Sequence, residues 1–344
     1  MMFRKFDRRA FLTGSLASIA LGMSKANAFA DERLELFPMR SDMPQDSLNP
    51  SGIRVAGIQM IPVVGGKYKV WTKKMGSGPI KVLLLHGGPG FGHEYLEAFE
   101  SFLPPANIEM YYYDQLGCNN SDVPDDPSLW TIPRYVEEIE EVRKGLGLKD
   151  FVLFGHSFGG VLAMEYALKY QKHLKGLIIS NMAASADSFL KHVVKYKKLL
   201  SEDKAKRLDR IEASGNYDDP DYGQIMMEDL YPVMLCRTKP WPEPLTRAMR
   251  HANYKIYELM QGKSEFLVTG NFKGWDIWNK LPEIKVKTLT IGAEFDEMDP
   301  RDMEKMAKLI PNGICLICKN GSHLSMYDDQ AVYFNGLLKF LKAL

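Results

Sequence analysis

Residues 155–160 read GHSFGG and separate two different hydrophobic patterns. Residues 151–154 form a short apolar run typical of a buried strand, and residues 161–168 carry apolar side chains at helical spacing. A G-x-S-x-G motif between a strand and a helix is typical of a nucleophile elbow, in which glycines permit a turn too sharp for side chains. The pattern therefore predicts Ser157 as a nucleophile raised above the end of a strand.

A serine hydroxyl is a weak nucleophile and needs a base together with a group that orients the base. In doubly wound hydrolases these follow in the order Ser, Asp or Glu, His. Residues 287–292 read as a strand followed by a loop with Asp296, and residues 314–318 read as the last strand, followed by His323. Ligands of such sheets bind at the carboxyl ends of the strands. We therefore predict the catalytic triad Ser157, Asp296 and His323.

Other readings of these two loops stay open. Asp296 could cap a helix beginning near Pro300, and His323 could be an ordinary loop histidine. Three further acids lie close enough to replace Asp296 in the triad, namely Glu294, Glu297 and Asp299.

Residues 86–90 read HGGPG directly after the apolar run 82–85. Acyl transfer places negative charge on the carbonyl oxygen, which backbone N–H groups aimed at that point stabilise. A glycine pair allows close approach of the backbone, so we predict an oxyanion hole formed by the N–H groups of Gly88 and Phe158. The alternative is a Gly/Pro turn without chemistry. His86 precedes the nucleophile in the chain and is expected to order the loop.

Together these motifs resemble those of the proline iminopeptidase family of α/β-hydrolases. The resemblance rests on HGGPG at 86–90, DQLG at 114–117, GHSFGG at 155–160 and the segment 265–277, and it covers about residues 50–344. The chain is most similar to the branch with the archaeal aminopeptidase that works with the tricorn protease and with bacterial amino-acid amidases. The resemblance implies an α/β-hydrolase fold with an inserted helical cap.

The resemblance also implies that Glu265 and Glu297 bind the substrate amine, since Phe295-Asp296-Glu297 matches the family pattern of Tyr or Phe, Asp and Glu. A physical reason supports this role. An exopeptidase must recognise a free α-amino group, which is largely protonated near pH 7. Carboxylates in a partly closed pocket bind that cation and set its distance from Ser157. The alternative is that both glutamates are solvated surface acids.

The chain begins with a basic segment, residues 1–9, followed by a short, weakly apolar stretch at residues 10–23. That stretch is too short for a bilayer span, which needs about 20 residues. The pattern is typical of a signal peptide over residues 1–30, with cleavage after Ala28 or Ala30. Arg8-Arg9 resembles a twin-arginine signal, which implies a periplasmic or secreted protein with no stable membrane association after cleavage. The alternative is a retained membrane anchor.

The 344 residues are 45% hydrophobic and 25% charged, as in ordinary globular proteins. The length suits one core domain with an inserted subdomain. The net charge of +1 gives no electrostatic footprint for nucleic acid. We expect a mostly parallel, doubly wound α/β sheet in residues 51–182 and 281–344, a helical cap in 183–280 and an N-terminal extension in 31–50.

The cysteines do not form a disulfide scaffold. Cys315 and Cys318 lie three residues apart on an expected strand, so their side chains point to opposite faces. This argues against a bridge and against a metal pair despite the C-x-x-C spacing. No His, Cys and carboxylate cluster has the spacing of metal ligands, so we expect no cofactor.

The sequence thus predicts a serine aminopeptidase that releases N-terminal residues, with proline the expected one, from short peptides. An amidase acting on amino-acid amides needs the same amine site, and a carboxylesterase would need none. A binding module with an inactive site is the alternative outside enzymes.

The export signal predicts the behaviour of one double variant. Arg8→Lys with Arg9→Lys should leave unprocessed precursor in the cytoplasm, because a receptor reads the arginine pair. Immunoblots of cytoplasmic and periplasmic fractions measure this. A variant that is still processed and exported would favour the ordinary secretory route.

Overall fold

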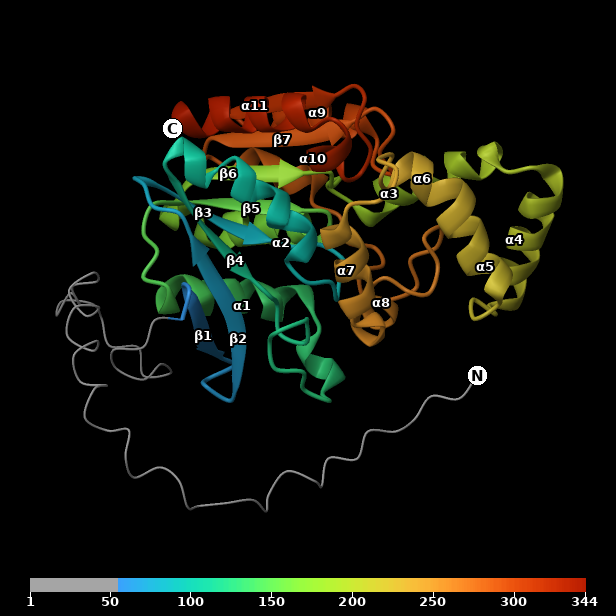
Figure 1. Cartoon of the computed structure of the whole chain (residues 1–344), viewed down its shortest axis with the longest axis horizontal. Helices are drawn as coiled ribbons and strands as arrows, with labels where there is room; N and C mark the ends of the chain where they lie inside the picture. Colours follow the sequence, from blue (N-terminus) through green and yellow to red (C-terminus); the bar gives the residue numbers. More distant parts are fainter. Residues whose placement is uncertain (1–54) are drawn as a thin grey trace, which may run out of the picture. The chain divides into compact units, whose positions relative to one another are not determined.

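The computed structural model describes residues 55–344, which contain an eight-stranded sheet (Figure 1). The spatial order of the strands is β1-β2-β4-β3-β5-β6-β7-β8. The strands are β1 (Ile58–Val63), β2 (Tyr68–Met75), β3 (Ile80–Leu85), β4 (Ile108–Tyr113), β5 (Phe151–His156), β6 (Leu174–Ser180), β7 (Thr288–Ala293) and β8 (Gly313–Cys318).

Strand direction places the loops that matter on one edge. β1 and β2 form an antiparallel hairpin, and β2 pairs antiparallel with β4. All pairs from β4 through β3, β5, β6 and β7 to β8 are parallel. The loops that follow β3, β5, β6, β7 and β8 therefore leave the same edge of the sheet, where ligands of this architecture bind.

Side chains of the central strands alternate between two apolar cores, as the pleat of a strand requires. In β3, Leu83 and Leu85 join the core under α1 (Ile132–Gly145), α2 (Phe158–Tyr170) and α9 (Pro300–Leu309). Val82 and Leu84 face the opposite core, with the 3₁₀ helix η1 (Glu94–Ser101) and α11 (Gln330–Lys342). Burial on both faces explains why these strands read as continuous apolar runs.

The segment between β6 and β7 is helical and forms the cap (Figure 1). Its α-helices are α3 (Ala186–Val193), α4 (Glu202–Ser214), α5 (Pro220–Ile225), α6 (Tyr231–Met234), α7 (Glu243–His251) and α8 (Tyr254–Met260). The cap is tied to the loop after β8, because the carbonyl oxygens of Met234 and Leu235 accept the N–H groups of His323 and Leu324 at 2.9 Å. A short helix, α10 (Ser325–Asp328), follows that loop.

All four cysteines are free thiols. Cys318 is buried and Cys315 is half-buried, on opposite faces of β8. Within residues 55–344, no helix has the length and apolarity needed to cross a membrane. The predicted signal peptide and the extension over residues 31–50 lie outside the described residues.

Candidate active site

Ser157 lies on the turn between β5 and α2, with φ of 54° and ψ of −129°. Positive φ is uncommon for a non-glycine residue and, when present, often marks a functional site. The flanking glycines make this turn possible. A Cβ on Gly155 would lie 2.1 Å from the carbonyl oxygen of Gly159, and one on Gly159 would lie 2.4 Å from that of Leu85. The sharp turn presents the Ser157 side chain to the pocket at the carboxyl edge of the sheet.

His323 and Asp296 come from the loops after β8 and β7 and contact each other directly. Nδ1 of His323 lies 2.8 Å from Oδ1 of Asp296, with both residues buried. The other carboxylate oxygen accepts Asn181 Nδ2 at 2.7 Å, and Oδ1 also accepts the N–H of Met298 at 3.1 Å. These donors hold the carboxylate in place, so it can fix the imidazole with Nε2 facing away from Asp296.

The neighbouring acid Asp299 has a different place. Its side chain accepts the N–H of Arg301 at 2.9 Å and caps α9. The capping position considered for Asp296 is therefore filled by Asp299. An Asp at this position stabilises the helix N-terminus.

The loop after β3 approaches Ser157 closely. A Cβ on Gly87 would lie 2.7 Å from Cβ of Ser157 and 3.2 Å from its Oγ, so only glycine fits. The next residue, Gly88, has φ of 116°, a conformation that favours glycine. Phe158 is the first residue of α2, where an N–H has no acceptor within the helix. Gly88 and Phe158 thus both line the pocket beside Ser157, as an oxyanion hole requires.

His86 orders this loop. Its Nε2 accepts the N–H of Gln115 at 3.1 Å, and Nε2 of Gln115 donates to the His86 carbonyl oxygen at 2.9 Å. Burial lowers the pKa of His86, in keeping with a neutral ring that accepts at Nε2.

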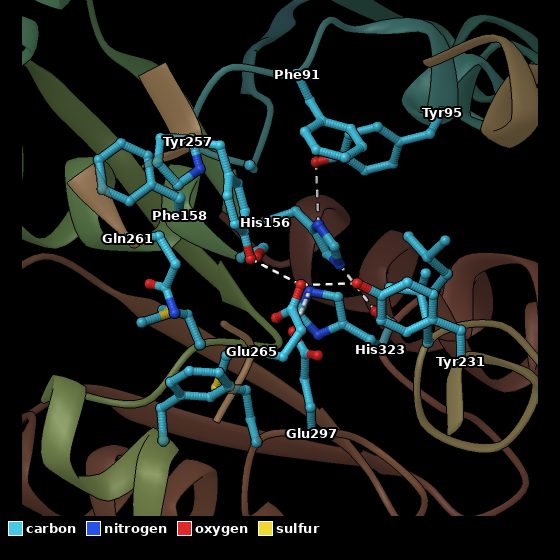
Figure 2. Close-up of a pocket in the computed structure, with 18 of the residues that line it drawn as sticks. Phe91, Tyr95, His156, Phe158, Tyr231, Tyr257, Gln261, Glu265, Glu297 and His323 are labelled. Carbon is cyan, nitrogen blue, oxygen red and sulfur yellow. Dashed lines mark hydrogen bonds and ion pairs between the residues drawn. The ribbon is translucent and has the colours of Figure 1, made fainter. Parts of the chain in front are cut away.

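Glu265 and Glu297 line the same pocket as Ser157 and His323 (Figure 2). Oε1 of Glu265 accepts the hydroxyl groups of Tyr231 and Tyr257, each at 2.7 Å. Oε1 of Glu297 lies 3.3 Å from Nε2 of His323. Two carboxylates, one from the cap and one from the loop after β7, therefore line the pocket that Ser157 also lines.

The two acids Glu265 and Glu297 are the only carboxylates among the described residues that line this pocket. Among its described lining residues there is no lysine or arginine, and most of the others are apolar: Pro89, Phe91, Phe158, Met182, Phe189, Leu235, Leu245, Met249, Phe272, Met298 and Leu324. Burial raises the pKa of Glu297, and the charges of Glu265 and Asp296 add to this, while His323 opposes it. The free volume is about 110 Å³. A dry cavity of about 150 Å³ holds benzene, so this pocket suits a compact group.

Comparisons with known proteins show the family and the fold of the chain. A family model described as the alpha/beta hydrolase fold matches residues 81–330. A proline iminopeptidase of Flavobacterium johnsoniae is 49% identical over 288 residues, which are 82% of this chain and 97% of the relative. The chain belongs to the proline iminopeptidase family. It is therefore a serine hydrolase of the α/β-hydrolase fold.

Two further proteins of this family extend the match. A proline iminopeptidase of Elizabethkingia meningoseptica is 47% identical over 290 residues, 82% of this chain and 97% of the relative. The crystal structure of proline iminopeptidase from Mycobacterium smegmatis is similar with a TM-score of 0.76 at 27% identity, covering 83% of this chain and 98% of that chain. The predicted family and fold are thus confirmed.

The structure also contains a series of linked hydrogen bonds that could not be predicted from the sequence. Nε2 of His156 lies 2.8 Å from the carbonyl oxygen of His323, which can only accept, so Nε2 carries the proton. Nδ1 therefore accepts the Tyr95 hydroxyl at 3.1 Å (Figure 2). That hydroxyl accepts the N–H of Gly87 at 2.6 Å. These linked hydrogen bonds thus join the loop after β3, the elbow and the loop that holds His323.

Little in the sequence marks the residues that form these linked hydrogen bonds. His156 adjoins Ser157, but its partners come from distant segments. Tyr95 lies on η1, and no motif marks it. The same holds for Asn181 behind Asp296 and for the tyrosines that hold Glu265.

The hydrogen bonds made by Tyr95 predict how Tyr95→Phe changes stability and activity. Tyr95→Phe leaves the buried Gly87 N–H and His156 Nδ1 without their partner, and each such loss costs about 1–3 kcal/mol. Urea unfolding should show a lower free energy of unfolding, and kcat should fall because the oxyanion loop and His323 lose a common support.

Tyr112→Phe is the matched control. Its buried hydroxyl makes a long hydrogen bond of 3.4 Å to the Leu96 carbonyl, and Tyr112 is not among the residues that line the pocket with Ser157. Equal stability and equal kcat in both variants would show that the hydrogen bonds through Tyr95 do not hold the loops around Ser157 in place.

Proposed function

We propose that this chain releases N-terminal residues, proline foremost, from short peptides as a serine aminopeptidase. The observation that carries the proposal is the pair of carboxylates, Glu265 and Glu297, in one pocket with Ser157 and no lysine or arginine in its described lining. The relatives from Flavobacterium johnsoniae and Elizabethkingia meningoseptica, both named proline iminopeptidase, support the same activity.

In the proposed reaction Ser157 Oγ attacks the carbonyl carbon of the first residue, and His323 Nε2 takes the hydroxyl proton. Asp296 holds the Nδ1 proton and stabilises the imidazolium that forms. The N–H groups of Gly88 and Phe158 bind the oxyanion. His323 then protonates the leaving nitrogen, which departs and leaves an acyl-enzyme on Ser157. A water molecule attacks the acyl carbon in the same way, with His323 taking its proton and returning a proton to Ser157.

Glu265 and Glu297 bind the substrate ammonium in this proposal. Because both line the pocket, one from the cap and one from the loop after β7, they can each accept one N–H of a cation between them. An N-terminal proline carries a secondary ammonium with two N–H groups, which matches two acceptors. Its compact ring also suits the small free volume of about 110 Å³.

An amidase acting on amino-acid amides is the second candidate, because it needs the same amine site and little room for a leaving group. A carboxylesterase would not use Glu265 and Glu297. A hydrolysis panel separates the three. It contains anilides of proline, alanine and phenylalanine with free and acetylated amines, prolinamide and a short acyl ester.

The compartment is a separate part of the proposal. The basic residues 1–9, the short apolar stretch and the alanines at 28 and 30 support export through a twin-arginine signal. The enzyme would then act on peptides in the periplasm or outside the cell.

Ser157→Ala tests the nucleophile. The variant should fold normally and lose hydrolysis of every substrate in the panel by several orders of magnitude, as serine hydrolases do without the triad serine. Ser214→Ala is the control, because this hydroxyl bonds only the Ile211 carbonyl and the Asn216 N–H in the cap. Turnover above a tenth of wild type in Ser157→Ala would exclude Ser157 as the nucleophile.

Acetylation of the substrate tests the amine site. It removes the cation and leaves two carboxylates facing an uncharged group. A charged hydrogen bond is worth about 1.5–3 kcal/mol, so kcat/KM for acetylated anilides should fall at least about tenfold. Equal cleavage of free and acetylated anilides would defeat the aminopeptidase proposal and favour the esterase.

A further inference from the structure

Both ring nitrogens of His323 face carboxylates. Nδ1 lies 2.8 Å from Oδ1 of Asp296, and Nε2 lies 3.3 Å from Oε1 of Glu297. Nε2 is the nitrogen that must take the proton of Ser157. The proposed amine-binding acid therefore contacts the atom on which catalysis depends.

Proton counting decides what this contact means. The Nδ1 proton is committed to Asp296, and an imidazole nitrogen and a carboxylate oxygen attract each other only with a further proton between them. That proton is on Nε2 or on Glu297. In either case the lone pair of Nε2 is engaged, and it cannot accept a proton from Ser157.

We propose that Glu297 occupies the base His323 in the free enzyme and that the substrate ammonium releases it by taking over the Glu297 carboxylate. This role rests on the proposed aminopeptidase function, because it gives the amine site a second task. The ammonium then serves both as a handle for binding and as the trigger that frees the base.

The groups around the imidazole agree with this role. Burial alone lowers the pKa of His323, but the charges of Glu297 and Asp296 and the hydrogen bond to Asp296 raise it overall, with a smaller contribution from Glu265. His156 faces the same loop as a neutral ring. The hydroxyl groups of Tyr231 and Tyr257 point at Glu265 and carry no charge (Figure 2).

The release step balances as follows. With the proton on Nε2, the free enzyme holds an imidazolium beside the Glu297 carboxylate, and the substrate arrives as an ammonium. In the complex the carboxylate pairs with the ammonium, the imidazolium loses its nearest anion, and its pKa falls. The Nε2 proton leaves to water, so each binding event of a cationic substrate releases a proton. No covalent bond changes before Ser157 attacks.

In this mechanism, substrates with and without an ammonium differ in kcat as well as in KM. A substrate without an ammonium leaves Glu297 on His323, so the base stays engaged even when the substrate is bound. A simple acyl ester should thus be hydrolysed only as the pH rises through the elevated pKa of the free-enzyme histidine. A proline anilide should show the acid limb of kcat at lower pH than the acid limb of kcat/KM, since kcat reports the complex.

Glu297→Gln with p-nitrophenyl acetate as the ester probe tests the inference. The neutral amide should move the acid limb of ester hydrolysis to lower pH and raise the rate near pH 7, by about tenfold for each pH unit that the limb moves. The same variant should hydrolyse proline anilide more slowly. A single substitution would thus accelerate one substrate and slow another.

Glu265→Gln is the matched control. This acid lies in the same pocket, but its carboxylate bonds Tyr231 and Tyr257 rather than His323. It should slow proline anilide while moving the ester limb much less than Glu297→Gln does. If the acid limb of ester hydrolysis moves equally in both variants, the cause is the loss of one negative charge anywhere in the pocket. That result would overturn the specific role of Glu297.

Calorimetry gives a reading that does not depend on the folding of the Glu297 variant. Prolinamide is titrated into Ser157→Ala near pH 7 in two buffers of different ionisation enthalpy. Net proton release on binding is expected, and its absence would overturn the inference.

The failure of this inference is distinct from failure of the proposed function. Suppose that acetylated substrates react more slowly while the acid limb of ester hydrolysis by Glu297→Gln stays at its wild-type pH. In that case the enzyme is an aminopeptidase in which Glu297 only binds the amine. If acetylation has no effect, the aminopeptidase proposal itself is wrong.

Discussion

The buried contact between His323 and Asp296 is the interaction on which the rest of the site depends. A fully buried carboxylate requires compensating donors, and Asp296 finds them in His323, in Asn181 just after β6 and in the N–H of Met298. These partners come from the ends of three neighbouring parallel strands, so only this sheet order brings them together. In the proposed mechanism, the fixed imidazole then determines where Ser157, the oxyanion donors and the substrate carbonyl must lie.

The second constraint is the acid pair above the nucleophile. Glu297 is 7% exposed, and its neighbours include the acids Asp296 and Glu265. An acid in such surroundings is stable only with a proton or a cation. The fold supplies His323 as the partner in the free enzyme, and the proposed substrate supplies a better one. In the proposed function, the burial of these acids therefore favours a substrate that carries an ammonium.

Much of this architecture could be predicted from the sequence, because local patterns encode it. The apolar runs gave the parallel strands, and the loops at their carboxyl ends located Ser157, Asp296 and His323 on one edge. The supporting polar groups could not be predicted. Tyr95, Tyr231 and Tyr257 lie on helices where a tyrosine reads as ordinary packing, and only the three-dimensional fold aims their hydroxyls. The contact between Glu297 and Nε2 of His323 likewise could not be predicted, because only the fold brings the two loops together.

The two histidines at the centre show how the surroundings set chemistry. The rings of His156 and His323 lie 4.7 Å apart between centroids. His156 has a carbonyl oxygen and a tyrosine hydroxyl as partners, and burial together with the nearby His323 charge keeps its pKa well below the ordinary value. His323 has two carboxylates, and its pKa is raised despite burial. A permanently neutral ring is suited to holding a loop in place, and a ring whose charge depends on Glu297 is suited to moving a proton. A positive charge on His323 disfavours a second positive charge on His156, which keeps His156 neutral.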